Sequence, residues 1–226
     1  MTEKNEKKTV SAKVNTVMEK NRKLLISLLV VLVVGLIGVI VYEIVSSKNK
    51  EKDLAAIDKI SYELVNESSS LTDAELSERS EKAMAELEAY LGKGGIVGVK
   101  ANNLAADLAY AKKDYEKALS YWTAVTEKGK KLYTYPIAKF NMASCLEELN
   151  RNEDAAAAYK ECSEVVDFVL ANHAKFNYGR VLEVMAKYEE AAEVYQQMND
   201  DNPYDSWSNI AKTRLISLEA DGKIKK

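Results

Sequence analysis

Three segments of the sequence repeat one another at an almost constant spacing. They read DYEKALSYW, RNEDAAAAY and KYEEAAEVY. Their central alanines, Ala118, Ala155 and Ala191, lie 37 and 36 residues apart. Self-similarity at a period near this length is typical of helical repeat arrays, in which each unit buries its apolar face against its neighbours. We therefore expect an all-α chain that contains a solenoid of related units.

Each of these segments follows a second stretch of helical character. The stretches read NNLAADLAYAKK, AKFNMASCLEEL and AKFNYGRVLEVM, and the last two begin with the same four residues. The chain has only 2 Pro and 9 Gly in 226 residues, which favours helix over sheet. Each unit is therefore expected to be a pair of helices joined by a turn.

The aligned units resemble the tetratricopeptide (TPR) family, whose repeat of about 34 residues forms a helix–turn–helix. The family has small residues at positions 8 and 20, which let the two helices approach closely, and an aromatic ring at position 24, which fills the space beside them. The resemblance implies three hairpins, at residues 99–132, 136–169 and 172–205. The packing residues that it implies are Ala106, Ala143, Gly179, Ala118, Ala155, Ala191, Trp122, Tyr159, Tyr195 and Pro203.

An uncharged apolar run, Leu24 to Tyr42, precedes the repeats and is nineteen residues long. As a helix rising about 1.5 Å per residue it would span roughly 28 Å, close to the hydrocarbon core of a bilayer. A cleaved signal peptide usually has a shorter apolar run followed by a small-residue cleavage site, and EIVSSKNK offers none. We favour an uncleaved transmembrane helix at 24–45 over a cleaved signal, and a buried core helix is the least favoured reading.

Charge beside the apolar run predicts its orientation. Seven Lys/Arg residues lie in the N-terminal tail, residues 1–23, and a smaller group of lysines follows the run. Because basic segments tend to stay in the cytoplasm, the tail is expected there and the C-terminal domain across the membrane.

Further helices are expected on both sides of the repeats. Residues 46–98 are expected to form a linker helix that continues from the membrane segment, followed by a helical hairpin. Thr72 and Glu75 have the spacing of a capping box at the start of a helix that ends near Leu91.

The C-terminal segment, residues 206–226, suits a capping helix and a tail, because an array exposes an apolar face at each end unless something covers it. Four residues of this helix are expected to face the array: Ile210, Ala211, Leu215 and Leu218. Arg214 is expected in solvent.

One membrane helix, a short basic tail and a small TPR array together resemble the YfgM-type family of bacterial inner-membrane proteins. That resemblance implies a single-pass protein of the inner membrane with its array in the periplasm. Its implied partners are the secretion translocon, periplasmic chaperones or exported clients. The alternative is a structural scaffold that self-associates or organises an envelope or cell-division complex.

No sequence feature predicts an enzyme, a cofactor, a metal site or a small-molecule substrate. The one histidine, His173, has no accompanying motif, and GKGGIVG does not match a phosphate-binding loop. From Ser46 onward, 25 basic residues face 31 acidic ones, which argues against nucleic-acid binding. Cys145 and Cys162 are expected as free, buried thiols, because the hairpin separates them by roughly 12–13 Å along its axis, too far for a disulfide.

A peptide-binding groove is expected along the first helix of each hairpin, by analogy with the TPR family. Its candidate residues are Asn103, Asp107, Tyr110, Phe140, Asn141, Ser144, Glu147, His173, Phe176, Asn177, Arg180 and Glu183. The family's clamp for a peptide carboxylate is not expected, since Asn103 stands where that clamp needs lysine.

Four of these candidates have stated roles. Asn141 and Asn177 are expected to hydrogen-bond an extended peptide backbone. Phe140 and Phe176 have two interpretations that the sequence does not separate. They supply apolar anchors for a ligand, or they replace the large apolar residue that position 4 usually holds and these repeats lack.

Overall fold

The computed structural model describes residues 15, 18–130 and 132–225, and over these residues the chain is helical with no strand. This confirms the expected all-α class. Four lysines of the basic tail (Lys4, Lys7, Lys8 and Lys13) lie outside the described residues. The chain divides into two compact units, Met1–Lys52 and Asp53–Lys226, and each is described by itself.

The first unit contains the apolar run, which lies without interruption in helix α2 (Arg22–Val65). Within the described residues α2 is the one helix long and apolar enough to cross a membrane, and its most apolar window is 0% buried. A core helix of a soluble protein would be mostly buried, so the structure disfavours that alternative. A signal sequence would meet the same criteria of length and composition.

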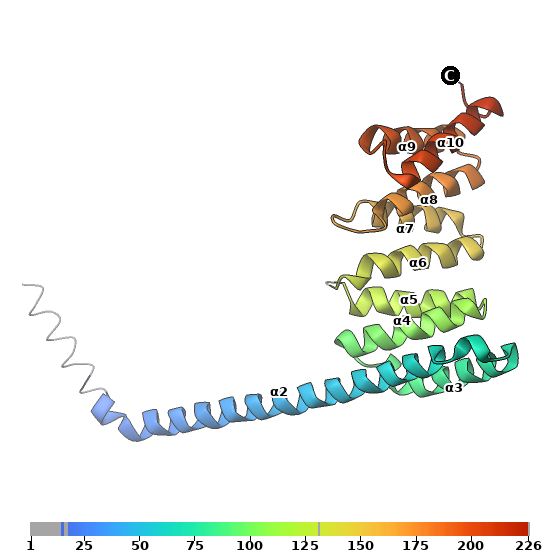
Figure 1. Cartoon of the computed structure of the whole chain (residues 1–226). Coiled ribbons are helices and arrows are strands. Elements are labelled where there is room, and N and C mark those ends of the chain that lie inside the picture. The colour runs from blue at the N-terminus through green and yellow to red at the C-terminus, as the bar shows by residue number, and fades with distance from the viewer. Residues whose placement is uncertain (1–14, 16–17, 131, 226) are drawn as a thin grey trace, which may run out of the picture. The chain divides into compact units, whose positions relative to one another are not determined.

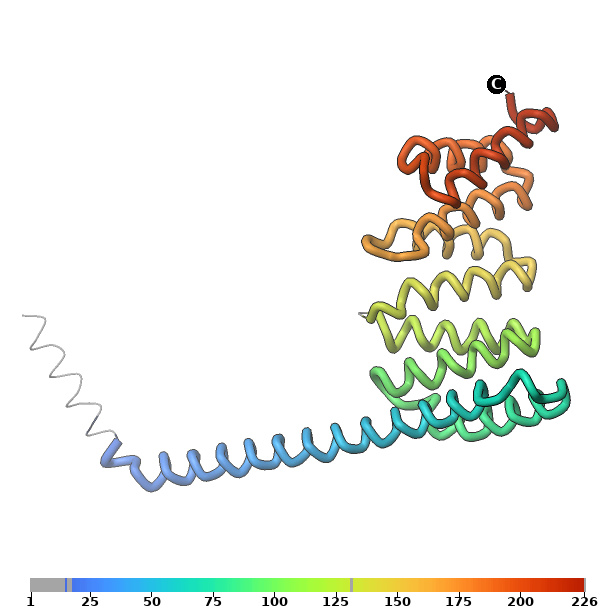
Figure 2. Tube along the Cα trace, in the orientation of Figure 1, coloured from blue at the N-terminus to red at the C-terminus, as the bar shows by residue number. Residues whose placement is uncertain are grey.

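The second unit is a stack of antiparallel helices, which Figure 1 shows in successive rows and Figure 2 as a continuous trace. After α2 come η1 (Ser68–Ser70), α3 (Asp73–Leu91), α4 (Gly95–Ala111), α5 (Tyr115–Lys128), α6 (Thr134–Glu148), α7 (Asn152–Ser163), α8 (Ala171–Val184), α9 (Tyr188–Asp201) and α10 (Ser206–Ala220). The pairs α4/α5, α6/α7 and α8/α9 are the three hairpins, and α4 begins four residues before the expected start at residue 99.

The start of α3 has the expected capping box. The backbone N–H of Glu75 donates to Oγ1 of Thr72 at 3.4 Å, and the backbone N–H of Thr72 donates to Oε2 of Glu75 at 2.8 Å. These bonds satisfy two donors that a helix N-terminus leaves free. The chain therefore turns from α2 into α3 where the sequence predicts.

The three hairpins share one turn geometry. Lys113, Asn150 and Ala186 occupy the same place in their repeats and have φ angles of 59°, 57° and 58°. In each turn the backbone N–H of the next residue donates to a carbonyl five residues earlier, at 2.9, 2.8 and 2.9 Å. Such bonds satisfy the last carbonyls of the first helix and reverse the chain within a few residues. The repeated sequence thus produces a repeated backbone.

The residues expected to pack the hairpins lie buried, except Pro203, which is exposed after α9. Gly179 shows why position 8 must be small. A Cβ built on this glycine would lie 2.5 Å from Cε1 of Tyr195, whose side chain is fully buried. A close helix contact and a large ring therefore depend on each other in the third hairpin.

Both cysteines are free and buried, as the sequence predicts. Burial raises the pKa of the Cys145 thiol to about 11 and that of Cys162 to about 12. Because the thiolate is the reactive form, both residues stay protonated at neutral pH and act as small apolar side chains.

Helix α10 covers the end of the array, but one of its side chains, Ile210, differs from expectation. Ala211 and Leu218 are buried, whereas Ile210 is 43% exposed. Adjacent helical residues point about 100° apart, so Ile210 and Ala211 cannot share one contact. Arg214 is exposed, as expected, but its guanidinium also bonds to Glu183 of α8.

Candidate peptide-binding face

The candidate groove residues all lie on α4, α6 and α8, the first helices of the three hairpins. We call the side of the array that they form the first-helix face. Four of them, Asp107, Tyr110, Asn141 and Ser144, line one pocket together with Trp122. The pocket has a volume of about 180 Å³ and lies between the first and second hairpins. We call it the α4/α6 pocket.

Polar groups in the α4/α6 pocket are only partly satisfied by the chain. Among the described residues, the side chains of Asp107 and Asn141 have no hydrogen bond or ion pair. Ser144 lies 3.0 Å from the hydroxyl of Tyr159, and the ring of Tyr110 packs edge-on against Tyr115 at 5.2 Å. Solvent reaches the Asp107 carboxylate, yet the surrounding helices displace enough water that burial raises its pKa. The pocket therefore offers an unpaired carboxylate and a free amide.

The second hairpin closes its part of the face with a chain of three polar side chains. The buried hydroxyl of Tyr159 donates to Oε2 of Glu147 at 2.8 Å. Nη2 of Arg180, on the next hairpin, donates to the same oxygen at 2.7 Å. Charge-assisted bonds of this kind are the stronger hydrogen bonds of proteins. We call this arrangement of Tyr, Glu and Arg a polar relay.

The third hairpin repeats the polar relay with α10 as its partner. The hydroxyl of Tyr195 donates to Oε1 of Glu183 at 2.6 Å, and Nε of Arg214 donates to the same oxygen at 3.0 Å. Burial alone would raise the pKa of Glu183, but the bonds from Arg214 and Tyr195 outweigh it and the pKa is lowered. The carboxylate is thus held ionised, and α10 takes the place of the first helix of a fourth unit.

The first hairpin lacks the polar relay. At the corresponding three positions it has Trp122, Tyr110 and Ser144 instead of Tyr, Glu and Arg. An indole has no hydroxyl to donate, and neither Tyr110 nor Ser144 carries charge at neutral pH. The α4/α6 pocket lies at the place that, in the other two hairpins, is closed by the Tyr and Glu of the hairpin and an Arg of the next unit.

Aromatic stacking closes the C-terminal end of the first-helix face. The ring of His173 stacks on Trp207 of α10, with centroids 3.7 Å apart and planes 7° apart, and lies 4.9 Å from the ring of Phe140. The ring of Phe176 lies 5.4 Å from Trp207 and 5.8 Å from Tyr195. Burial, and next the charge of Arg180, lowers the pKa of His173. The histidine is therefore held as a neutral ring in an aromatic cluster.

Burial separates the two interpretations of the phenylalanines. Phe140 and Phe176 are only 9% and 8% exposed, which supports the interpretation that they replace missing core packing. Asn177 is also buried, at 8% exposure, and accepts a long bond of 3.4 Å from Arg180. Asn103 is half-buried and does not line the α4/α6 pocket. The candidate residues thus divide into two groups. Asp107, Tyr110, Asn141 and Ser144 line the pocket, whereas Phe140, Phe176 and Asn177 are buried.

Sequence reasoning missed the polar relay and the role of Trp207. A signal for the relay was present, because Glu147–Tyr159 and Glu183–Tyr195 have the same spacing of 12 residues. Its arginines come from the next unit, so a repeat read in isolation does not show them.

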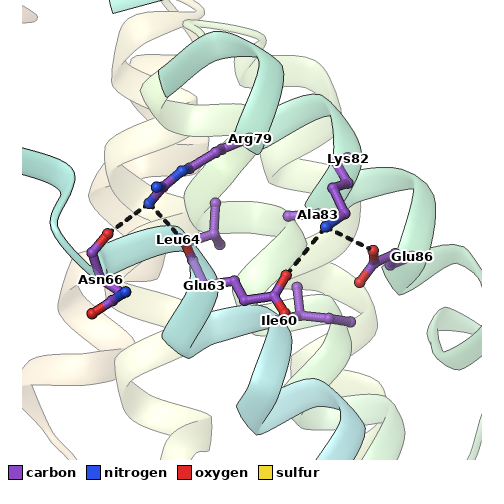
Figure 3. A pocket seen from close by; sticks show the side chains of 8 residues that line it. All are labelled: Ile60, Glu63, Leu64, Asn66, Arg79, Lys82, Ala83 and Glu86. Carbon is purple, nitrogen blue, oxygen red and sulfur yellow. Dashed lines mark hydrogen bonds and ion pairs between the residues drawn. The ribbon is translucent and has the colours of Figure 1, made fainter. Parts of the chain in front are cut away.

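A second pocket, of about 360 Å³, lies between the end of α2 and α3 (Figure 3). Its charged groups are already paired: Nζ of Lys82 lies 3.3 Å from Glu63 and 3.7 Å from Glu86. Nη1 of Arg79 donates to the backbone carbonyls of Glu63 and Asn66 at 3.0 and 2.6 Å. Arg79 therefore caps the C-terminus of α2. The residues that line this pocket hold the end of α2 against α3, so we interpret the pocket as structural.

Comparison with known proteins supports the repeat architecture. A family model described as a tetratricopeptide repeat-like domain matches residues 17–220, which includes α2 and α10. The TPR repeat-containing protein of Treponema pallidum (strain Nichols) is 25% identical over 130 residues, covering 58% of this chain and 54% of that protein. The chain thus spans about half the length of this relative. These matches support membership of the repeat family, but they do not test the resemblance to the narrower YfgM-type family. The chain belongs to the tetratricopeptide repeat-like domain family, and this membership indicates a protein–protein interaction module.

Proposed function

We propose that the protein is a membrane-anchored protein-interaction module with its TPR array on the extracytoplasmic side of a bacterial inner membrane. Its partners are the secretion translocon, periplasmic chaperones or exported clients. The observation that carries the proposal is the combination of two features in one chain. One is an apolar helix that nothing in the described chain covers, and the other is a repeat array with an open polar pocket.

The proposed activity is binding without chemistry. His173 packs between the rings of Trp207 and Phe140, where it contributes to the array. Within the described part of the chain no three His, Cys, Asp or Glu side chains gather in a way that could hold a metal ion. The unpaired polar groups of the α4/α6 pocket are suited to hydrogen-bonding a polypeptide segment, which is what a TPR array offers a partner.

Membrane topology tests the first part of the proposal. The full chain should remain in the membrane fraction after alkaline extraction, and its intact mass should retain the N-terminal residues. Protease added to spheroplasts should remove the array and leave a protected fragment that includes the apolar run, Leu24 to Tyr42. Release of a shortened chain into the soluble fraction would show a cleaved signal instead, and complete protection of the array would reverse the orientation.

Crosslinking in living cells tests the second part. The full chain, purified from crosslinked membranes, should carry translocon subunits, chaperones or exported proteins in defined adducts. Adducts that contain only copies of this chain would favour a self-associating scaffold. Recovery of cytoplasmic proteins alone would contradict the proposed location of the array.

A further inference from the structure

The α4/α6 pocket has a negative charge with no counter-charge of its own. Among the described residues that line it, Asp107 is the one carboxylate and none has a basic side chain. The ion-paired lysines at 100, 112 and 117 bond to Asp58, Glu81 and Asp114 rather than to Asp107. Burial, and next the charge of Glu148, raises the pKa of Tyr110 at the rim. The surroundings of the pocket are therefore acidic.

Comparison with the closed hairpins shows what the pocket lacks. There the chain supplies both charges: Glu147 meets Arg180, and Glu183 meets Arg214. Asp107 occupies in α4 the repeat position that Arg180 occupies in α8. Asp107 stays exposed to solvent, but the neighbouring helices displace part of its water and the described chain gives its carboxylate no partner. A bound cation would supply that partner. In the first hairpin the described lining of the pocket supplies no such cation.

The size and lining of the pocket match one long side chain. Its volume is about 180 Å³. This is below the roughly 300–1,000 Å³ of pockets that hold drug-sized molecules. The exposed ring of Tyr110 offers an apolar surface to an alkyl stem, and the buried ring of Trp122 forms the apolar base of the pocket. Asn141 carries a free amide that can donate to and accept from a peptide backbone.

We propose that the α4/α6 pocket binds a lysine or arginine side chain of an extended polypeptide segment. Asp107 pairs with the cation, the ring of Tyr110 contacts its stem, and Asn141 bonds to the adjoining backbone. This inference rests on the proposed function as a protein-interaction module and specifies the chemistry of its partner.

Peptide selection on the full chain, purified in detergent, tests the inference. A phage-displayed library of random twelve-residue peptides is selected in parallel on wild type, Asp107→Asn and Glu193→Gln. Asp107→Asn keeps the shape of the side chain and removes its charge. Glu193→Gln is the matched control, because Glu193 is an exposed residue of α9 with no bond to another described side chain. Circular dichroism checks that all three proteins have the same helix content.

The expected result is enrichment of lysine or arginine at one position with wild type and with Glu193→Gln, and loss of that enrichment with Asp107→Asn. A recovered peptide is then synthesised with an acetylated N-terminus and an amidated C-terminus, so that its only cation is the side chain. Replacing its Lys or Arg by Gln, or Asp107 by Asn, should weaken its binding to the full chain by about tenfold or more.

Two results would overturn the inference in different ways. Selected peptides without a preferred cation, or with one that Asp107→Asn leaves unchanged, would overturn the assigned chemistry and leave the interaction function standing. Absence of any selected peptide on wild type would overturn both the pocket and the proposed recognition of extended polypeptide segments.

Discussion

The two ends of the first-helix face differ in how their polar groups are satisfied. At the C-terminal end, Glu147 and Glu183 accept bonds from the chain's own tyrosines and arginines, and Trp207 covers His173. At the N-terminal end, the side chains of Asp107 and Asn141 have no partner among the described residues. Groups that bind a ligand are often less than optimal for stability in the free protein. We therefore propose that the C-terminal end of the face contributes mainly to stability and that the N-terminal end binds the partner.

The difference arises from a few substitutions on a common backbone. The three hairpins share their turns and small packing residues, so the backbone presents each position in the same way. Replacing Tyr, Glu and Arg by Trp122, Tyr110 and Ser144 removes one polar relay and leaves a pocket. A repeat array can thus create a site without changing its fold.

The largest expected effect follows from removing the ring of Tyr195. Tyr195→Ala deletes a fully buried aromatic side chain and should lower the free energy of unfolding by about 3–5 kcal/mol. Because neighbouring repeats stabilise one another, hydrogen exchange should quicken most in α8, α9 and α10. Equal loss of protection in α4 and α5 would contradict separate roles for the two ends.

Gly179→Val is expected to cause the second largest loss of stability. A Cβ at this position meets the buried ring of Tyr195, so the substitution should cost about 1–3 kcal/mol despite the better helix propensity of the new residue. Gly92→Ala is the control, because nothing lies within 4 Å of a Cβ built there. Urea unfolding of the full chain in detergent measures both. A Gly179→Val protein as stable as Gly92→Ala would show that the third hairpin is not closely packed.

The polar relay predicts that part of the protein's stability is lost as the pH falls. The pKa of Glu183 is lowered in the folded state, so its contribution is complete above the unfolded pKa of about 4.3 and is lost as pH falls through the folded value. Glu183→Gln should cost about 1 kcal/mol at pH 7, because Arg214 is partly exposed and its charge is screened. The cost should vanish in strong acid. A cost independent of pH would mean that shape, not charge, matters there.

Asp107→Asn is expected to have the smallest effect and the opposite sign. The folded pKa of Asp107 is raised, so its ionised form destabilises the fold above that pKa, and protonation removes the penalty as pH falls. The variant should therefore be slightly more stable than wild type at pH 7, within about 0.5 kcal/mol, and equally stable in acid. A marked loss of stability at pH 7 would show that Asp107 holds the array together.

Local signals made much of this fold predictable. Alanines at a fixed spacing predicted the hairpins, and Thr72 and Glu75 predicted a helix start, because both depend on neighbours close in sequence. The burial of Phe140 and Phe176 stayed open, since it depends on rings from other helices: Tyr159 and His173 for Phe140, Tyr195 and Trp207 for Phe176. The polar relay links residues 33 and 31 positions apart, and Trp207 reaches His173 from another helix. To predict contacts between residues this far apart, one must know how neighbouring repeats are aligned against each other. A single sequence does not specify that alignment.

Site-specific photo-crosslinking tests the division between the two ends most directly. A photoreactive phenylalanine analogue is placed at Ala111 or at Val184, which are exposed and occupy the same repeat position in α4 and α8. With the full chain in its native membrane, the probe at 111, beside Tyr110 of the α4/α6 pocket, should form partner adducts. The probe at 184 should form few or none. Adducts from 184 that equal or exceed those from 111 would contradict the assignment of binding to the N-terminal end.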